Sequence, residues 1–205
     1  MELSSLKSST IFKLKFKWSL SSIKDLLNSL FPNAKMIFFL LVMDIILKNK
    51  FIFFKDYKIK CAIGKRGITN KKIEGDKCTP RGRFKLKYIF YRKKRVKNIS
   101  SKLKLIPIKK NFGWCDDVKS KFYNRLIKLP SQDRAEELYL KENIYDIVVV
   151  IDYNLNPVKK KRGSAIFLHI AKKNYLPTLG CIAISKRHLI KLVSIINKNT
   201  FLKIF

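Results

Sequence analysis

Residues 146–152 have the sequence Asp-Ile-Val-Val-Val-Ile-Asp, in which five β-branched residues stand between two aspartates. β-branched side chains favour an extended backbone, and an apolar run without polar alternation is typical of a strand that is buried on both faces. We therefore predict a central strand over residues 147–151, with both of its faces covered.

Further strands are predicted on both sides of this run, where apolar residues cluster or alternate with polar ones. They cover residues 57–63, 84–88, 165–171, 181–184 and 200–205. A helix is predicted after Ser185, which is in position to cap it, and a short helix over residues 131–141 with Ser131 as its cap. Strands outnumber helices and do not alternate regularly with them, so the sequence predicts an α+β, sheet-dominated domain rather than a doubly wound fold.

The chain of 205 residues is strongly basic, with 46 Lys and Arg against 14 Asp and Glu and a formal net charge of +32. Such a charge suggests a nucleic-acid or anionic-surface binder. A disordered basic tail is excluded because 47% of the residues are hydrophobic. Lys outnumbers Arg about fourfold and the basic residues are scattered along every segment. Arg is the better bidentate reader of phosphates and bases, so this pattern weighs against nucleic-acid binding, which stays an alternative.

Residues 1–42 differ in composition from the rest and are predicted to be an N-terminal extension, followed by a single domain over residues 43–205. The apolar run at residues 36–42 is far shorter than the roughly 20 residues a membrane-spanning helix needs, and no small-x-small cleavage site follows it. Two interpretations stay open. The extension is poorly packed, with translation starting at Met36 or Met43, or it is a weak membrane anchor.

The four cysteines are not spaced as a metal site or a redox pair. No two of them have C-x-x-C spacing, which argues against a zinc ribbon and a thioredoxin-type site, and we predict no metal and no cofactor. Two disulfides are arithmetically possible, in three connectivities that the spacing does not distinguish. The four residues are Cys61, Cys78, Cys115 and Cys181.

His169 and Cys181 fall on two of the predicted strands. Side chains alternate along a strand, so Phe167 and His169 share one face. If the two strands are neighbours, the same face carries Cys181, and the imidazole lies beside the thiol. An imidazole within hydrogen-bond reach favours the thiolate, which attacks carbonyl carbons. Gly180, which lacks a Cβ, lets its backbone N–H approach a developing oxyanion.

Three segments around this pair form a recognisable set. Residues 163–169 read Gly-Ser-Ala-Ile-Phe-Leu-His, residues 177–183 read Pro-Thr-Leu-Gly-Cys-Ile-Ala, and residues 74–84 contain Thr-Pro-Arg-Gly-Arg-Phe. Together they resemble the active-site signature of the L,D-transpeptidase catalytic domain family (the YkuD type). Three further segments resemble a bacterial subgroup with a Thr-x-Gly-Cys turn, namely residues 113–117, 123–124 and 145–154. The resemblance extends from about residue 44 to the end of the chain.

The turn departs from the better-known members in two places. Those members have a second histidine before the glycine, and an Arg or Asn two residues after the cysteine. Here these positions are Leu179 and Ala183. The nucleophile and the base are present, whereas any substrate contact those two side chains supply is absent.

The resemblance implies a β-rich catalytic domain acting on peptidoglycan stem peptides, and so a role in cell wall biogenesis and cell shape. Cys181 is implied to be the nucleophile, forming a thioester acyl-enzyme, and His169 the general base. An amine resolves the thioester into a cross-link, or water resolves it as in an L,D-carboxypeptidase. The resemblance also implies a location in the cell envelope or periplasm. We further expect a monomer, with membrane contact limited to the N-terminal extension.

Several further residues are candidates for the oxyanion hole or for substrate binding. They are Gly180, Thr178, Ser164, Asn154 and Arg81. Arg81 is in a position to pair with substrate carboxylates, although a solvated basic loop is the alternative. For the group that orients His169, the sequence leaves three possibilities: a backbone carbonyl, Asn154 or Ser164.

Overall fold

A computed structural model describes residues 44–205, so the predicted extension over residues 1–42 lies outside the described residues. Nine strands form one sheet, in the order β13-β12-β11-β6-β14-β1-β2-β3, with β7 paired to β6. Their bounds are β1 Ile45–Lys48, β2 Phe51–Phe54, β3 Tyr57–Lys60, β6 Gly82–Tyr91, β7 Lys104–Pro107, β11 Ile147–Ile151, β12 Phe167–Ile170, β13 Ile182–Ile184 and β14 Phe201–Ile204. The prediction of a sheet-dominated α+β domain is confirmed.

The two ends of the sheet curl towards each other. The chain that leaves β3 forms an antiparallel bridge from Ala62 to Ala183 of β13, and a parallel bridge from Gly64 to Thr178 just before β13. The sheet therefore approaches a closed barrel. These bridges bring the N-terminal part of the domain against the turn that carries Cys181.

The predicted central strand is confirmed, since β11 covers residues 147–151 and every residue in it is buried. Its two faces belong to two separate cores. Ile147, Val149 and Ile151 pack into the first core. Val148 and Val150 pack into the second. A strand with an apolar layer on each side needs the unbroken β-branched run that the sequence provides.

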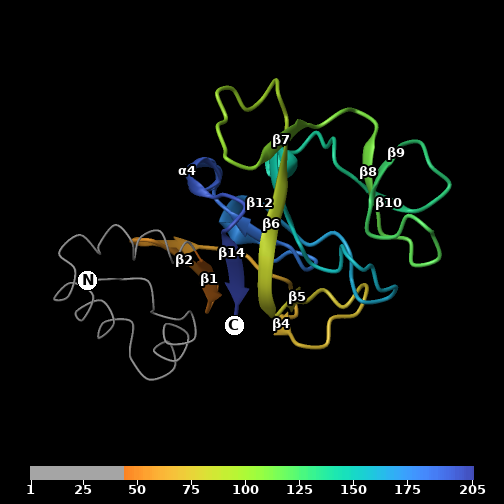
Figure 1. Ribbon diagram of the computed structural model, residues 1–205, viewed down its shortest axis with the longest axis horizontal. Helices are drawn as coiled ribbons and strands as arrows, with labels where there is room; N and C mark the ends of the chain where they lie inside the picture. Colours follow the sequence, from red (N-terminus) through yellow and green to blue (C-terminus); the bar gives the residue numbers. More distant parts are fainter. Residues whose placement is uncertain (1–43) are drawn as a thin grey trace, which may run out of the picture. The chain divides into compact units, whose positions relative to one another are not determined.

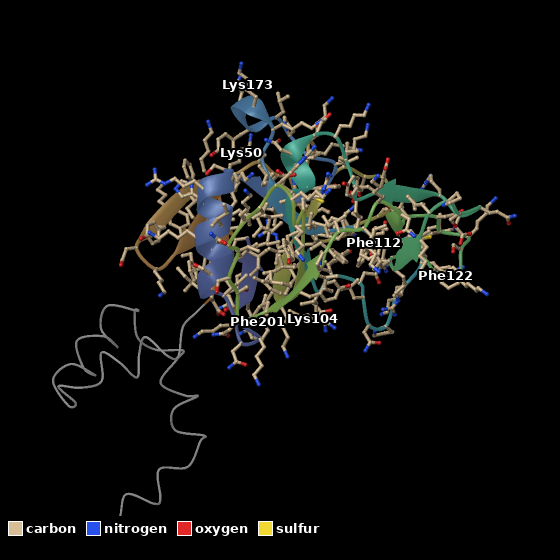
Figure 2. The ribbon with its side chains drawn as sticks, turned by 90° about the horizontal axis from the view of Figure 1, so that it is seen from above. Lys50, Lys104, Phe112, Phe122, Lys173 and Phe201 are labelled. Atoms are coloured by element: carbon tan, nitrogen blue, oxygen red, sulfur yellow. The ribbon has the colours of Figure 1, made fainter. Side chains whose placement is uncertain are left out.

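One helix, α4, spans Lys186–Ile195 and covers the first core through Leu189, Leu192 and Val193. Ser185 is its N-cap, as predicted, and its side chain accepts a hydrogen bond from the backbone N–H of His188. A second, smaller sheet consists of β8 (Phe112–Cys115), β9 (Leu126–Lys128) and β10 (Ala135–Glu137). Helix α4 and this small sheet lie on opposite sides of β6 (Figures 1 and 2). The second core, which holds Cys181, is therefore on the side of the small sheet.

The predicted helix over residues 131–141 is wrong. This region instead contains β10, Ala135–Glu137, which pairs with β8, Phe112–Cys115, and β8 also pairs with β9, Leu126–Lys128. Ser131 does not cap a helix, and its hydroxyl accepts a hydrogen bond from the backbone N–H of Asp133 in a local turn. Pairing with β8, which is distant in the sequence, outweighs the local helical preference.

The remaining elements are short. They are β4 Ile68–Thr69, β5 Thr79–Pro80, and the 3-10 turns η1 Asn143–Tyr145 and η2 Lys173–Tyr175. Within residues 44–205, no helix has the length and apolar character needed to cross a membrane.

Replacing Val149 with Ala should destabilise the domain by about 2 kcal/mol, because it removes two methyl groups from a fully buried position and leaves a cavity. Urea denaturation measures the change. The same substitution at Val158, a partly exposed loop residue, is the matched control and should cost well under about 1 kcal/mol. Equal losses at the two positions would contradict the assignment of β11 as the central strand.

Candidate active site

The strand pairing brings His169 and Cys181 to the same side of the sheet. Strands β12 and β13 are parallel neighbours, with His169 opposite Ala183 and Leu168 opposite Ile182. Leu168 and Ile182 face the first core, whereas Phe167 and Cys181 belong to the second. The predicted pairing and the predicted faces are therefore confirmed.

The Cys181 side chain is held in place by backbone groups at the start of β12 and just before it. Its Sγ donates to the carbonyl oxygen of Ala165 at 3.0 Å and accepts from the N–H of Phe167 at 3.4 Å. Burial raises the pKa of the thiol, and the nearby Glu136 carboxylate raises it further. The resting side chain is accordingly a neutral thiol rather than a thiolate.

His169 is oriented by a backbone carbonyl, one of the three possibilities left by the sequence. Its Nδ1 lies 2.9 Å from the carbonyl oxygen of Ile170. A carbonyl only accepts, so Nδ1 carries the proton in this contact, and the backbone of Ile144 forms a second hydrogen bond with the ring. The ring makes an edge contact with Tyr145, at 5.2 Å between centroids. Burial, assisted by the charge of Lys172, lowers the pKa of His169 to about 4.

The turn before Cys181 is fixed by two threonine hydroxyls. Thr178 Oγ1 donates to the Cys181 carbonyl at 2.5 Å and accepts from the Gly180 N–H at 3.2 Å. Thr79 Oγ1 donates to the Gly180 carbonyl at 2.9 Å and accepts from the Gly64 N–H at 2.9 Å. The Thr-Pro segment thus connects the N-terminal part of the domain to the active-site turn.

Gly180 is required here for a packing reason as well as a conformational one. Its φ of +141° is rarely adopted by other residues. A Cβ at this position would lie 2.9 Å from the backbone oxygen of Cys78. The predicted role of its N–H towards an oxyanion is not tested by this geometry.

Asn124 is a site residue whose role sequence reasoning missed. It is 1% exposed and uses its side-chain amide fully. Its Oδ1 accepts from Trp114 Nε1 at 2.9 Å and from the Ala165 N–H at 3.1 Å. Its Nδ2 donates to the Tyr153 and Asn154 carbonyls. Because the Ala165 carbonyl holds the Cys181 thiol, Asn124 helps to fix the residue whose carbonyl positions the nucleophile. In the sequence, only the Tyr123-Asn124 motif pointed to Asn124 as a residue of interest.

Asn154 and Ser164 have structural partners away from His169. The Asn154 side chain bonds to the backbone of Lys159 and Gly163 and so closes its own loop. Ser164 Oγ donates to Glu74 Oε2 at 2.7 Å, as does Tyr123 OH at 2.5 Å. Neither residue therefore orients His169 in this structure, and their contacts with substrate stay predictions.

Arg81 is exposed, and its backbone N–H donates to the Thr69 carbonyl at the side of the β4–β5 pair. Leu179, at the position of the missing second histidine, is 76% exposed, and Ala183 is buried next to His169. The four cysteines are free. Among residues 44–205 no group of acidic, histidine and cysteine side chains is arranged to hold a metal ion.

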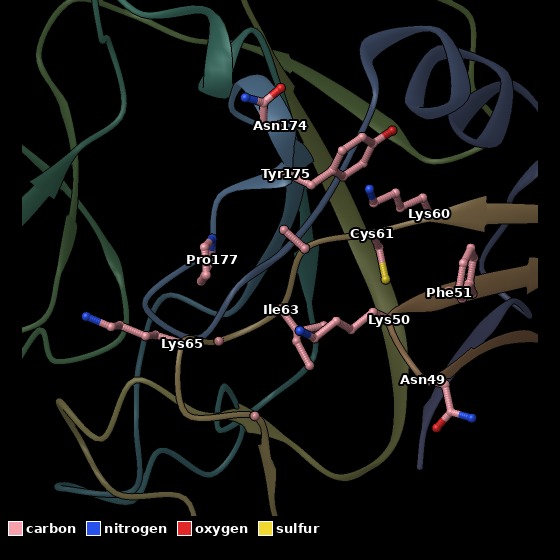
Figure 3. A pocket seen from close by; sticks show the side chains of 13 residues that line it. Asn49, Lys50, Phe51, Lys60, Cys61, Ile63, Lys65, Asn174, Tyr175 and Pro177 are labelled. Atoms are coloured by element: carbon pink, nitrogen blue, oxygen red, sulfur yellow. The ribbon is translucent and has the colours of Figure 1, made fainter.

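A cavity of about 430 Å³ is separate from this pair (Figure 3). Lys50, Lys60, Lys65 and Tyr175 contribute to its wall, and neither His169 nor Cys181 lines it. It borders the segment that bridges to Thr178, so it lies next to the active-site turn without containing the thiol.

Comparison with known families identifies the class of protein. The model of the L,D-transpeptidase catalytic domain family (YkuD) matches residues 45–204, almost the entire described chain. The chain therefore belongs to this family, and the predicted family is confirmed, whereas the subgroup with the Thr-x-Gly-Cys turn stays a prediction. A search of curated proteins found no match.

Replacing Thr79 with Val should destabilise the domain by about 2–4 kcal/mol, because the buried Gly64 N–H and Gly180 carbonyl lose their partner. Thr79→Ser keeps the hydroxyl and should retain most of the stability. Thermal or urea unfolding of both variants provides the measurement. A Val variant as stable as the Ser variant would show that the hydroxyl bridge contributes nothing.

Proposed function

We propose that this domain is a cysteine-dependent L,D-transpeptidase that acts on peptidoglycan stem peptides through a thioester acyl-enzyme. The observation that carries the proposal is the placement of Cys181 and His169 on the same face of two paired strands. Membership of the family supports transpeptidase chemistry in general. The thioester and the roles of the two residues are our inference.

In the acylation step, His169 Nε2 takes the proton from Cys181 as Sγ attacks the carbonyl of an L-configured residue. The tetrahedral intermediate collapses with cleavage of the peptide bond. The imidazolium then returns its proton to the leaving D-amino acid. Both side chains are neutral at rest, because the pKa of the thiol is raised and that of the imidazole is lowered, so the thiol gives up its proton during acylation.

The developing oxyanion needs donors at the turn. The Gly180 N–H already donates to Thr178 Oγ1, so the Cys181 N–H is the better candidate of the two amides. Thr178 then acts by holding the turn in shape. Gly180 contributes by allowing the close approach of the chain at residue 78.

In the deacylation step, an amine from a neighbouring stem attacks the thioester carbon, a new amide forms, and the thiol is regenerated. Water in the same position gives a free carboxylate and a trimmed peptide, the L,D-carboxypeptidase outcome. Product analysis with and without an added amine acceptor distinguishes the two reactions.

The substrate implies a location in the cell envelope, and we propose that the domain acts there as a monomer. The net charge of +32 then favours attraction to an anionic envelope polymer over base recognition. Membrane contact through residues 1–42 is part of the same proposal. Nucleic-acid binding would instead require affinity that falls steeply with salt.

Incubation with a tetrapeptide stem or a carbapenem should give a covalent adduct on Cys181, detected by mass spectrometry of the intact protein and its peptides. Cys181→Ala should abolish the adduct. Cys78→Ala, which removes a partly exposed cysteine outside the pair, should leave it unchanged. An adduct that survives in Cys181→Ala would refute the nucleophile.

The rate of acylation should depend on pH through His169, which accepts a proton only when it is neutral. Its pKa of about 4 predicts an acid limb with its midpoint near pH 4 rather than at the ordinary value of 6.5, and a plateau between about pH 6 and 8. His169→Gln should lower the plateau about 10²–10⁴-fold and remove the limb. Single-turnover kinetics measure both. A limb that persists unchanged in His169→Gln would exclude this residue as the base.

A further inference from the structure

The backbone that holds the Cys181 thiol adopts an unusual conformation just before β12. Gly163 and Ala165 both have a positive φ, of +93° and +50°. Glycine adopts this conformation freely, whereas the Cβ of alanine is crowded there, so Ala165 keeps it only where surrounding contacts hold it. In this bend, at residues 163–165, the Ala165 carbonyl accepts from Cys181 Sγ at 3.0 Å. The position of the sulfur therefore depends on the contacts that fix the bend.

Glu74 connects the bend to a distant part of the domain. It lies in the loop between β4 and β5. Its Oε2 accepts from Ser164 Oγ at 2.7 Å and from Tyr123 OH at 2.5 Å. One carboxylate oxygen therefore joins the residue before Ala165 to the Tyr123-Asn124 motif.

The two residues bound by Glu74 are chain neighbours of the two that position the thiol. Ser164 precedes Ala165, whose carbonyl binds the sulfur. Tyr123 precedes Asn124, whose Oδ1 accepts from the Ala165 N–H at 3.1 Å. Glu74 thus restrains Ala165 both along the chain and across the fold.

Burial makes the Glu74 carboxylate hard to replace as an acceptor. Tyr123 and Ser164 are buried, so their hydroxyls need a partner within the protein. Burial, together with the hydrogen bond to Glu74, raises the pKa of Tyr123, which keeps this hydroxyl a neutral donor. Hydrogen bonds to a carboxylate are stronger than those to a neutral oxygen. Loss of Glu74 therefore leaves both hydroxyls without this acceptor and loosens the bend.

The same segment of the chain supports the nucleophile at two further points. The side chain of Lys72 packs against Gly163, where an added Cβ would lie 2.9 Å from Lys72 Cγ. At the end of the loop, Thr79 Oγ1 donates to the Gly180 carbonyl at 2.9 Å, in the turn before the nucleophile. Residues 72–79 thus contact both chain segments that lead to the thiol and to its acceptor.

We propose that Glu74 is a positioning residue for the nucleophile. Its carboxylate holds the Ser164 and Tyr123 hydroxyls in place. The Ala165 carbonyl, fixed in this way, keeps the Cys181 thiol in one orientation. The effect on acylation rests on the proposed function, whereas the effect on the thiol itself needs no substrate. Because a misplaced nucleophile slows the chemical step, Glu74 contributes to kcat rather than to substrate binding.

The S–H stretching band of Cys181 reports on this hydrogen bond without turnover. A thiol is a weak donor, and its stretching frequency falls when it donates a hydrogen bond. Raman spectroscopy records the band as the difference between each protein and its Cys181→Ala counterpart. Glu74→Ala should move the band to higher frequency and broaden it, because the bond to the Ala165 carbonyl weakens. A band in Glu74→Ala identical to that of the wild-type protein would overturn the proposal.

Two control variants accompany this measurement. Glu74→Gln removes the charge but keeps an oxygen that accepts from both hydroxyls, so its band should stay close to that of the wild-type protein. Glu137→Ala removes an exposed glutamate of β10 and should leave the band unchanged. An equal shift in Glu74→Gln and Glu74→Ala would show that charge, rather than the hydrogen bonds, is responsible, and would overturn the proposal.

Acylation kinetics separate positioning from binding. Glu74→Ala should lower kcat for acylation about tenfold or more and change KM less than about twofold, whereas Glu74→Gln should stay within about threefold of the wild type in both. A loss confined to KM would contradict a positioning role. If no peptide acylates the wild-type protein, the proposed function fails, while the S–H band still tests the position of the thiol.

Smaller truncations test the same route. Ser164→Ala removes one hydroxyl bound by Glu74 and should shift the band in the same direction, which keeps the test available if thermal unfolding shows that Glu74→Ala does not fold. In a protein that carries Tyr123→Phe and Ser164→Ala together, Glu74→Ala should lower kcat less than about twofold further, because the three side chains act as one unit. A full further loss in that background would show that Glu74 acts by another route and would overturn the proposal.

Discussion

The parallel pairing of β12 with β13 is the constraint on which the candidate site depends. It sets His169 opposite Ala183, so the thiol of Cys181, two positions earlier, emerges from the same face. The pairing is stable because β11, buried on both faces, supports β12 from the other side. The Thr79 hydroxyl then fixes the turn that leads into β13. Backbone geometry, rather than a direct side-chain bond, thus determines how the two side chains are placed.

Burial sets the electrostatic character of the site. It raises the pKa of Cys181 and lowers that of His169, so both groups are neutral before substrate binds. The acidic side chain of Glu136 strengthens this resting state. Groups with such shifted pKa values cluster at functional sites.

Local sequence patterns predicted the elements whose energetics are local. The β-branched run of residues 147–151 became β11, and Ser185 capped α4. The helix over residues 131–141 failed because a long-range partner, β8, decided its conformation. Asn124 was missed because its role depends on four hydrogen bonds to distant backbone and side chains.

The sequence by itself determined the sheet-dominated class, the central strand, and His169 and Cys181 as the candidate pair. These depend on side-chain alternation, β-branching and short motifs, which are properties of adjacent residues. The tertiary structure alone decided that the Ile170 carbonyl orients His169. It also decided that the side-chain amide of Asn124 binds the backbone N–H of Ala165, close to the Cys181 thiol. The contact of Asn124 with Ala165 joins residues far apart in the chain, and only packing of the strands brings them together. The carbonyl of Ile170 is adjacent to His169 in the chain, but the ring meets it only because the fold fixes the conformation of the side chain.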